Sequence, residues 1–315
     1  MTVTSSCPAA AGGISTLCMA SNATGAQRAT WIRRLCWRML QLALPASLLL
    51  ACQQSGVRAP EPEPQVQRPV RFLLTFDDGP STWEPYNPTR AILDQLAANP
   101  LEPRIKAVFF VQTRDPRAGG GPAGASLLER EERESHVVAL HTATASGHRS
   151  HVRLGAAELD HSLADGIEDL SSITGEVPRL VRPPFWSYNE AVLGAYRAHE
   201  LRMLLTDLSA RDGVIYGWNM SLRRRSHMHS ALAKAKAAIL QGRLPVVDGV
   251  VPVIVTFHDT NTFTARHMTE YLHILVEEAG DERLPLADPP FYNDKPALLR
   301  AAMLRAQAGA YAPGP

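Results

Sequence analysis

Cysteine is absent from most of this 315-residue chain, because all four cysteines lie within the first 52 residues. The remaining sequence therefore has neither a disulfide framework nor a thiolate metal site, and any metal there must have histidine and carboxylate ligands. Charge of one sign is also not in excess, since 32 basic and 31 acidic residues leave a formal net charge of +1. Without a basic patch there is little to attract nucleic acid, so we expect no nucleic-acid partner.

An apolar run near the N-terminus is too short to span a membrane comfortably. It covers residues 39–50, follows three arginines within 33–38, and ends in Leu-Leu-Ala before Cys52. This pattern resembles the signal peptide of a bacterial lipoprotein, whose cysteine becomes the acylated N-terminus. We therefore expect a leader at 1–52 and an exported protein that a lipid on Cys52 anchors to a membrane of the cell envelope, in the periplasm or at the outer membrane. An ordinary signal peptide is the alternative.

The next segment, residues 53–69, is rich in proline, glutamate and glutamine and has almost no large apolar side chain. Such a composition cannot bury enough surface to fold, which predicts a stiff, solvated tether. Globular sequence begins at Val70. We therefore expect one folded domain at 70–300 and a C-terminal tail at 301–315.

The globular part alternates short apolar runs with amphipathic stretches. The runs are too continuously apolar to be half exposed, which predicts buried parallel strands at 71–76, 107–111, 136–140, 178–182, 201–207 and 251–258. Apolar side chains at helical spacing predict helices at 89–98, 158–173, 228–240 and 264–279. Three glycines and a proline at 119–122 predict a loop insertion. The alternation of strand and helix indicates an α/β fold with a parallel sheet, either open or closed into a barrel.

Polar side chains follow the apolar runs, at the strand ends where chemistry gathers in parallel α/β folds. They are Asp77, Asp78, His141, Arg182, Asp207 and His258. Two adjacent carboxylates after a buried strand are expensive to keep ionised without partners, and a bound metal removes that cost. Asp-Asp-Gly is also common in ordinary turns, so this motif alone favours neither interpretation.

Three histidines within eleven residues, His141, His148 and His151, follow the third apolar run. Exposed histidines on a polar loop are one interpretation. Beside the double aspartate, however, three imidazoles favour a site for a divalent metal. Imidazole and carboxylate ligands suit zinc best, although other first-row ions accept the same ligands.

These residues resemble the motifs of the polysaccharide deacetylases with a NodB-homology domain (carbohydrate esterase family four). The sequence TFDDGP at 75–80 matches the first signature of that family. The resemblance covers about residues 70–259 and implies a distorted (β/α) barrel of parallel strands. It also implies that Asp77 is the catalytic base and that Asp78 is a metal ligand.

The second signature of that family, His-Ser/Thr-x-x-His, supplies two histidine ligands to the metal. Residues 141–142 match its start, alanine occupies the position four residues after His141, and residues 150–154 resemble its end. An insertion of six residues between the two ligands accounts for this spacing. The resemblance then implies that His151 is the second imidazole ligand, with His148 as its competitor.

The third signature matches residues 182–185 (RPPF), with Trp186 where glycine is usual. The resemblance implies that Arg182 orients the catalytic aspartate and that the Phe185 N–H stabilises the oxyanion. An arginine–carboxylate pair is geometrically suited to such orientation. The alternative is a rigid Pro-Pro turn with a surface arginine.

The fourth and fifth signatures are altered but follow in the family's order. Residues 207–213 resemble the fourth, which implies that Asp212, or alternatively Asp207, pairs with the catalytic histidine. His258 ends the last clear strand and matches the fifth. The resemblance implies that His258 is the general acid.

Together these expectations describe a zinc-dependent hydrolase that removes N-acetyl groups from an extracytoplasmic, N-acetylglucosamine-containing polysaccharide and releases acetate. An O-acetyl esterase or small-amide hydrolase with the same site is one alternative, and a catalytically silent carbohydrate-binding lipoprotein is another. The presence of both a base and an acid favours an enzyme. Several glycans fit these residues equally well, and no pattern predicts an oligomeric state. Aromatic residues that could stack on a sugar are Trp83, Tyr86, Trp186 and Trp218.

Overall fold

The computed structural model describes residues 68–212 and 224–307. All described residues belong to one compact unit, Pro64–Pro315. The expected leader, Cys52, most of the expected tether and Trp218 lie outside the described residues.

A single sheet of eight strands runs through the described part, and every pairing within it is parallel. Neighbouring strands follow the order β5-β4-β3-β2-β1-β7-β6, and β8 pairs with the first half of β1. The strands are β1 (Val70–Asp77), β2 (Ala107–Gln112), β3 (Val137–Thr142), β4 (Leu180–Val181), β5 (Arg202–Met203), β6 (Leu208–Ser209), β7 (Val251–His258) and β8 (Leu286–Phe291).

The helices begin and end at residues suited to helix termini. Asn87 caps α1 by accepting a hydrogen bond from the Arg90 N–H, and Asn189 caps α4 through the Val192 N–H. Gly175 ends α3 in the left-handed conformation. The helices are α1 (Pro88–Ala97), α2 (Pro122–Arg133), α3 (Ala156–Thr174), α4 (Glu190–Ala198), α5 (Arg224–Leu240), α6 (Thr262–Arg266), α7 (Met268–Asp281) and α8 (Lys295–Gln307), with short 3-10 turns η1 (His151–Arg153) and η2 (Pro184–Trp186).

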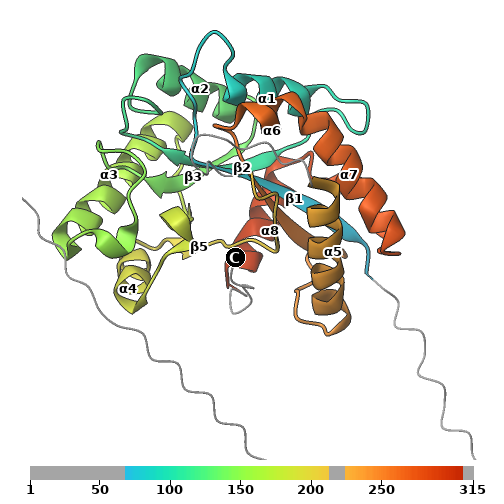
Figure 1. Cartoon of the computed structure of the whole chain (residues 1–315). Coiled ribbons are helices and arrows are strands. Elements are labelled where there is room, and N and C mark those ends of the chain that lie inside the picture. The colour runs from blue at the N-terminus through green and yellow to red at the C-terminus, as the bar shows by residue number, and fades with distance from the viewer. Residues whose placement is uncertain (1–67, 213–223, 308–315) are drawn as a thin grey trace, which may run out of the picture. The chain divides into compact units, whose positions relative to one another are not determined.

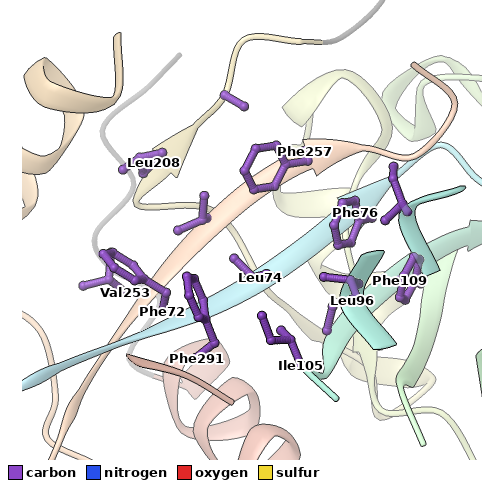
Figure 2. Packing of buried hydrophobic residues seen from close by; sticks show 14 of the residues in the cluster. Phe72, Leu74, Phe76, Leu96, Ile105, Phe109, Leu208, Val253, Phe257 and Phe291 are labelled. Carbon is purple, nitrogen blue, oxygen red and sulfur yellow. The ribbon is translucent and has the colours of Figure 1, made fainter. Parts of the chain in front are cut away.

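Alternate side chains of the long strands enter two different apolar layers, as the pleat of a strand requires. Phe76 belongs to the larger layer, where its ring centroid lies 4.9 Å from that of Phe109 and 5.7 Å from that of Phe257 (Figure 2). Leu73 points the other way, into a smaller layer that it shares with Leu298 of α8. Polar residues that lie an even number of positions from Leu73 therefore face this smaller layer.

Helix α8 lies on the opposite side of the sheet from α1 and α2 (Figure 1), and Leu298, Ala301 and Ala302 pack into the smaller layer. A parallel sheet with helices outside it and one helix against its inner face confirms the predicted fold class, a distorted (β/α) barrel. Because α8 continues to Gln307, the described fold extends beyond residue 300, where we expected a tail to begin.

The short elements differ from the sequence expectations. Strands β4 and β5 have two residues each, less than the apolar runs at 178–182 and 201–207. Beyond β5, the carbonyls of Leu204 and Leu205 accept hydrogen bonds from the buried side chain of Arg182. The glycines at 119–122 lead directly into α2, where Pro122 suits the first turn. The expected helix at 264–279 is two helices that meet at His267. Within the described ranges, no helix is both long and apolar enough to cross a membrane.

Candidate active site

The strand ends bring the predicted polar residues to one face of the sheet. Asp77, His141 and His258 end or nearly end β1, β3 and β7, and Arg182 follows β4 directly. Each lies an even number of residues from a side chain of the smaller layer on its own strand, such as Leu73 of β1 or Ile254 of β7. Because side chains alternate along a strand, all four point to the inner face.

Asp77 and Arg182 form a buried ion pair at the centre of this group. The Arg182 Nη1 donates to Asp77 Oδ1 and to Thr75 Oγ1, at 2.7 Å in each case. The remaining guanidinium nitrogens donate to the carbonyls of Leu204 and Leu205, at 2.9 and 3.2 Å. With four hydrogen bonds and no exposed surface, the guanidinium has one available position and fixes the carboxylate of Asp77.

Asp78, His141 and His148 form the one group of convergent metal-ligand atoms among the described residues. Asp78 Oδ1 lies 3.1 Å from His141 Nε2 and 3.2 Å from His148 Nε2, and the two Nε2 atoms are 3.0 Å apart. The Nδ1 of His141 lies 2.8 Å from the carbonyl oxygen of Arg182, which orients the ring with Nε2 toward Asp78. Two imidazoles and a carboxylate are a donor set that fits a divalent ion.

The structure places His148, the competitor, beside His141 and Asp78, and it does not place His151 there. The backbone turns at Gly147, whose φ of +87° suits glycine, and the Gly147 carbonyl accepts a hydrogen bond from Thr144 Oγ1. Because of this turn, the chain reaches Asp78 and His141 at His148, three residues before the position that the six-residue insertion predicted. His148 then stacks between the rings of His141 and Phe185, with centroid distances of 4.9 and 4.3 Å.

His151 lies outside this group of ligand atoms. It begins η1, is 1% exposed, and its Nδ1 lies 2.6 Å from the Tyr196 hydroxyl of α4. Burial, with the neighbouring His141 and His148, lowers the pKa of His151 to about 3, so the ring is neutral.

The charges of the ligand group suit a cation. Burial by itself raises the pKa of Asp78, but the hydrogen bond with His141 and the charges of His148 and His258 hold that pKa well below its usual range. Burial lowers the pKa of His148 to about 4, against the attraction of Asp78. At neutral pH the group therefore holds an ionised carboxylate and a neutral imidazole of His148, the protonation states that metal binding requires.

His258 and Asp212 form the predicted histidine–carboxylate pair. His258 Nδ1 lies 2.8 Å from Asp212 Oδ1, and the other carboxylate oxygen accepts from the His258 N–H at 3.0 Å and from Thr264 Oγ1 at 2.6 Å. Burial opposes the charged ring, but Asp212, and after it Asp78 and Asp77, raise the pKa of His258 to about 10. A protonated histidine held in this way can donate a proton from Nε2.

Asp207, the alternative partner predicted for His258, binds other residues instead. Its Oδ2 accepts from the Ile254 N–H at 2.8 Å, and its Oδ1 binds Arg305 of α8. The side chain is 2% exposed, so it belongs to the packing between α8 and the sheet.

These residues surround a cleft of about 480 Å³. Phe185, which is 61% exposed, and Trp186 form part of its wall, and both have positive φ, at 60° and 56°. The Trp186 ring also lies 5.1 Å from the guanidinium carbon of Arg182, so it covers the ion pair. Of the other aromatic candidates, Trp83 is 68% exposed and Tyr86 packs against the apolar core, and neither lines the cleft.

Gln112 supports the site and was not among the predicted residues. Its Nε2 donates to the Asp78 carbonyl at 2.6 Å, and its N–H donates to the Gly79 carbonyl at 2.8 Å. It therefore holds the backbone of the turn that presents Asp78. A polar residue that ends a buried strand is the same signal that identified Asp77 and His258, so the rule would have found it.

Comparison with known proteins points to one family. The polysaccharide deacetylase family profile matches residues 66–204. A chitin deacetylase from a Pestalotiopsis species is 33% identical over 125 residues, which are 40% of this chain and 37% of that protein. The peptidoglycan-N-acetylglucosamine deacetylase PgdA of Listeria monocytogenes is 24% identical over 243 residues, 75% of this chain and 44% of that protein. The chain thus matches less than half of the length of either relative.

A solved structure agrees on the fold. The chitin deacetylase of the fungal pathogen Colletotrichum lindemuthianum superposes with a TM-score of 0.51 at 21% identity, covering 72% of this chain and 92% of that one. At 21% identity, this likeness concerns the arrangement of strands and helices alone.

Proposed function

We propose that this chain is a member of the polysaccharide deacetylase family, and that it is a metal-dependent hydrolase that removes N-acetyl groups from an N-acetylglucosamine-containing glycan outside the cytoplasm. The observation that carries the proposal is the placement of three functional groups around one cleft: the ligand group Asp78, His141 and His148, the fixed base Asp77, and the acid His258. A binding protein has no use for a base and an acid that line the same cleft as a metal site.

The ligand group would hold a divalent ion, and zinc is the ion that its donor set suits best. When bound, such an ion supplies a Lewis acid for the acetyl carbonyl and favours a nucleophilic water at neutral pH. The stacked His148 and Phe185 rings hold one wall of the cleft against which the acetyl group would lie.

The chain's own residues then manage the protons and the charge. Asp77, ionised and held by Arg182, accepts the proton of the attacking water. Phe185 lines the cleft, and its N–H would donate to the oxyanion of the tetrahedral intermediate. His258, kept protonated by Asp212, donates its proton to the sugar nitrogen as the C–N bond breaks.

Metal content and acetate release, measured on the same purified sample, test the proposal. We expect about one equivalent of divalent metal per chain and acetate release from N-acetylglucosamine oligomers or peptidoglycan. Asp77→Asn should keep the metal and lower kcat by at least about 100-fold, because it removes the base. Asp248→Asn, an exposed aspartate away from the cleft, is the matched control and should leave both unchanged.

Two outcomes would overturn this proposal. Metal binding without acetate release from any N-acetylated glycan would contradict deacetylation. Release from O-acetylated glycans alone would identify an esterase, in which replacing His258 would have little effect because an alcohol leaves more easily than an amine.

We also propose that the chain is exported and anchored through Cys52, with the tether at 53–69 spacing the catalytic domain from the membrane. The sequence supports this, as does the name of the PgdA relative, which acts on peptidoglycan. Mass spectrometry of the mature N-terminus should find an acylated Cys52, and Cys52→Ser should release the protein from the membrane fraction. A mature N-terminus at any other residue would contradict the anchor.

A further inference from the structure

One cation at the cleft has no ionic partner among the described residues. The two carboxylates that line the cleft have other contacts, because Asp77 pairs with Arg182 and Asp78 lies in the ligand group with the two histidines, where a metal would balance its charge. Arg211 also lines the cleft, is exposed, and forms no ion pair with any of the described residues. The neighbouring sequence does not provide an anion either, because residues 213–223 contain neither aspartate nor glutamate.

An arginine on a loose surface loop needs no partner, but the backbone at Arg211 is fixed on both sides. Ala210 is fully buried, and its N–H donates to the Thr256 carbonyl of β7 at 2.9 Å. Asp212 is also fully buried, and its carboxylate binds His258 and Thr264. The Arg211 N–H donates to Ser209 Oγ at 3.1 Å. The residue is thus held between two anchored neighbours.

This fixed backbone has a strained conformation. The φ of Arg211 is +52°, in the left-handed region that residues with a side chain rarely adopt. Such a conformation costs about 1–3 kcal/mol and persists where the surroundings impose it, often at binding sites. Arg211 lines the same cleft as the proposed base, the proposed acid and the ligand group.

We propose that Arg211 binds an anionic substituent of the sugar, so that the cleft selects an N-acetylated glycan that carries a carboxylate or a phosphate near the reacting amide. This inference rests on the proposed function and specifies its substrate class. A guanidinium offers paired N–H donors that match both oxyanions, and it stays charged at all physiological pH values. A neutral glycan would leave this cation solvated and without a partner.

The test compares charged and neutral forms of one glycan. Peptide-free peptidoglycan strands have free carboxylates, and converting these to methylamides makes the neutral form. A second pair is an N-acetylglucosamine oligomer with and without a 6-phosphate. With the wild-type protein, we expect kcat/KM to be about tenfold or more higher for the charged form of one pair, since a charge-assisted hydrogen bond has that effect. The pair that shows the difference identifies the anion.

Arg211→Gln should bring this ratio close to one, and Arg211→Lys should give an intermediate ratio because it keeps the charge but loses the paired donors. Arg104→Gln is the matched control, since Arg104 is also an exposed arginine with positive φ, at 64°, but precedes β2 at the opposite ends of the strands. It should keep the wild-type ratio.

Measurements of glycan affinity distinguish a failure of this inference from a failure of the proposed function. With a chelator present and no turnover, the Kd ratio of charged to neutral glycan tests Arg211 even if no glycan yields acetate. A ratio near one for both pairs in the wild-type protein, or a preference that survives in Arg211→Gln, would overturn the inference. Loss of acetate release from every glycan, with the Kd preference intact, would contradict deacetylation only.

Discussion

At the scale of single residues, the ion pair of Asp77 and Arg182 has the strongest influence on the proposed chemistry. Both side chains are almost without exposed surface, and the guanidinium has carbonyl, hydroxyl and carboxylate partners at once. Removing one member leaves the other as a buried, uncompensated charge. The pair therefore couples the stability of the fold to the position of the base.

We expect Arg182→Met to lower the free energy of unfolding by about 3–5 kcal/mol, because it leaves Asp77 unpaired. In the double variant with Asp77→Asn the loss should be smaller than the sum of the two single losses. Urea denaturation of the four proteins measures this coupling. The exposed pair of Arg179 and Glu200 is the control, with a coupling of about 1 kcal/mol or less. Additive losses at Asp77 and Arg182 would contradict a coupled pair.

A second residue-scale effect is at His136, which precedes β3. The side chain is 1% exposed, and its Nδ1 accepts a hydrogen bond from the Ala107 N–H at 3.1 Å. Burial, and after it the charges of Lys106 and Arg130, lower the pKa of His136 to about 3. Between pH 6.5 and 3 the unfolded chain therefore binds a proton at this residue that the folded chain does not bind.

The contribution of His136 to stability should consequently be complete above pH 6.5 and fall as the pH is lowered. The contribution of His136 between pH 7.5 and pH 5 is about 2 kcal/mol. His136→Asn, which keeps an acceptor near Nδ1, should be less stable at pH 7.5 but lose about 2 kcal/mol less than the wild type on going to pH 5. Urea denaturation at both pH values, with metal chelated, measures the difference. An equal loss in both proteins would show that His136 does not titrate on unfolding.

At the scale of elements, the turn between His141 and His148 determines which imidazole reaches Asp78. Gly147 has a φ of +87°, and a Cβ there would lie 2.5 Å from the Asp115 carboxylate. Any larger residue at position 147 must therefore shift the backbone there, directly before His148. This turn is also where the sequence prediction of the ligands was least successful.

Gly147→Ala should lower the affinity for zinc by about tenfold or more, since it displaces one ligand while His141 and Asp78 stay in place. Calorimetric titration of zinc into the metal-free protein measures the change. Gly155→Ala is the matched control, because Gly155 has an ordinary negative φ and open space around its Cα. Equal affinities in the two variants would mean that the turn does not position His148.

The sequence was informative about the site where a functional residue ends a long buried strand. Asp77 and His258 belong to eight-residue strands whose direction and side-chain alternation follow from the pattern of apolar residues. His148 lies on a turn whose course depends on the φ of Gly147 and on contacts with Asp115 and Phe185, which are distant in sequence. Spacing therefore predicted His151 with His148 as its competitor, whereas the structure places His148 beside Asp78 and His141. In the same way, the partner of Asp207 could not be predicted, because Arg305 lies 98 residues away.

At the scale of the whole domain, α8 holds the inner face of the sheet. Arg305 of α8 pairs with Asp207, and their side chains are 6% and 2% exposed. Asp207 follows the segment whose carbonyls hold Arg182. Helix α8 thus supports, through one buried ion pair, the strand ends that carry the proposed catalytic residues. Sequence periodicity did not predict this helix, because its apolar residues do not form a single clear stripe.

We expect Arg305→Met to lower the free energy of unfolding by about 3–5 kcal/mol, because Asp207 would remain buried without its cation. Arg300→Met on the same helix is the control. Its partner is Asp248, both side chains are more than half exposed, and the loss should be about 1 kcal/mol or less. Thermal and urea denaturation measure both losses. Similar losses in the two variants would contradict a structural role for the buried pair.

The central claim is that Asp78, His141 and His148 hold the metal that the reaction needs. Zinc titration of the metal-free wild type, His148→Ala and His151→Ala, with acetate release measured on the same samples, tests it most directly. The account predicts that His148→Ala lowers zinc affinity by at least about 100-fold and abolishes acetate release, whereas His151→Ala stays within about tenfold of the wild type. Loss of zinc and activity in His151→Ala, with both retained in His148→Ala, would contradict the account.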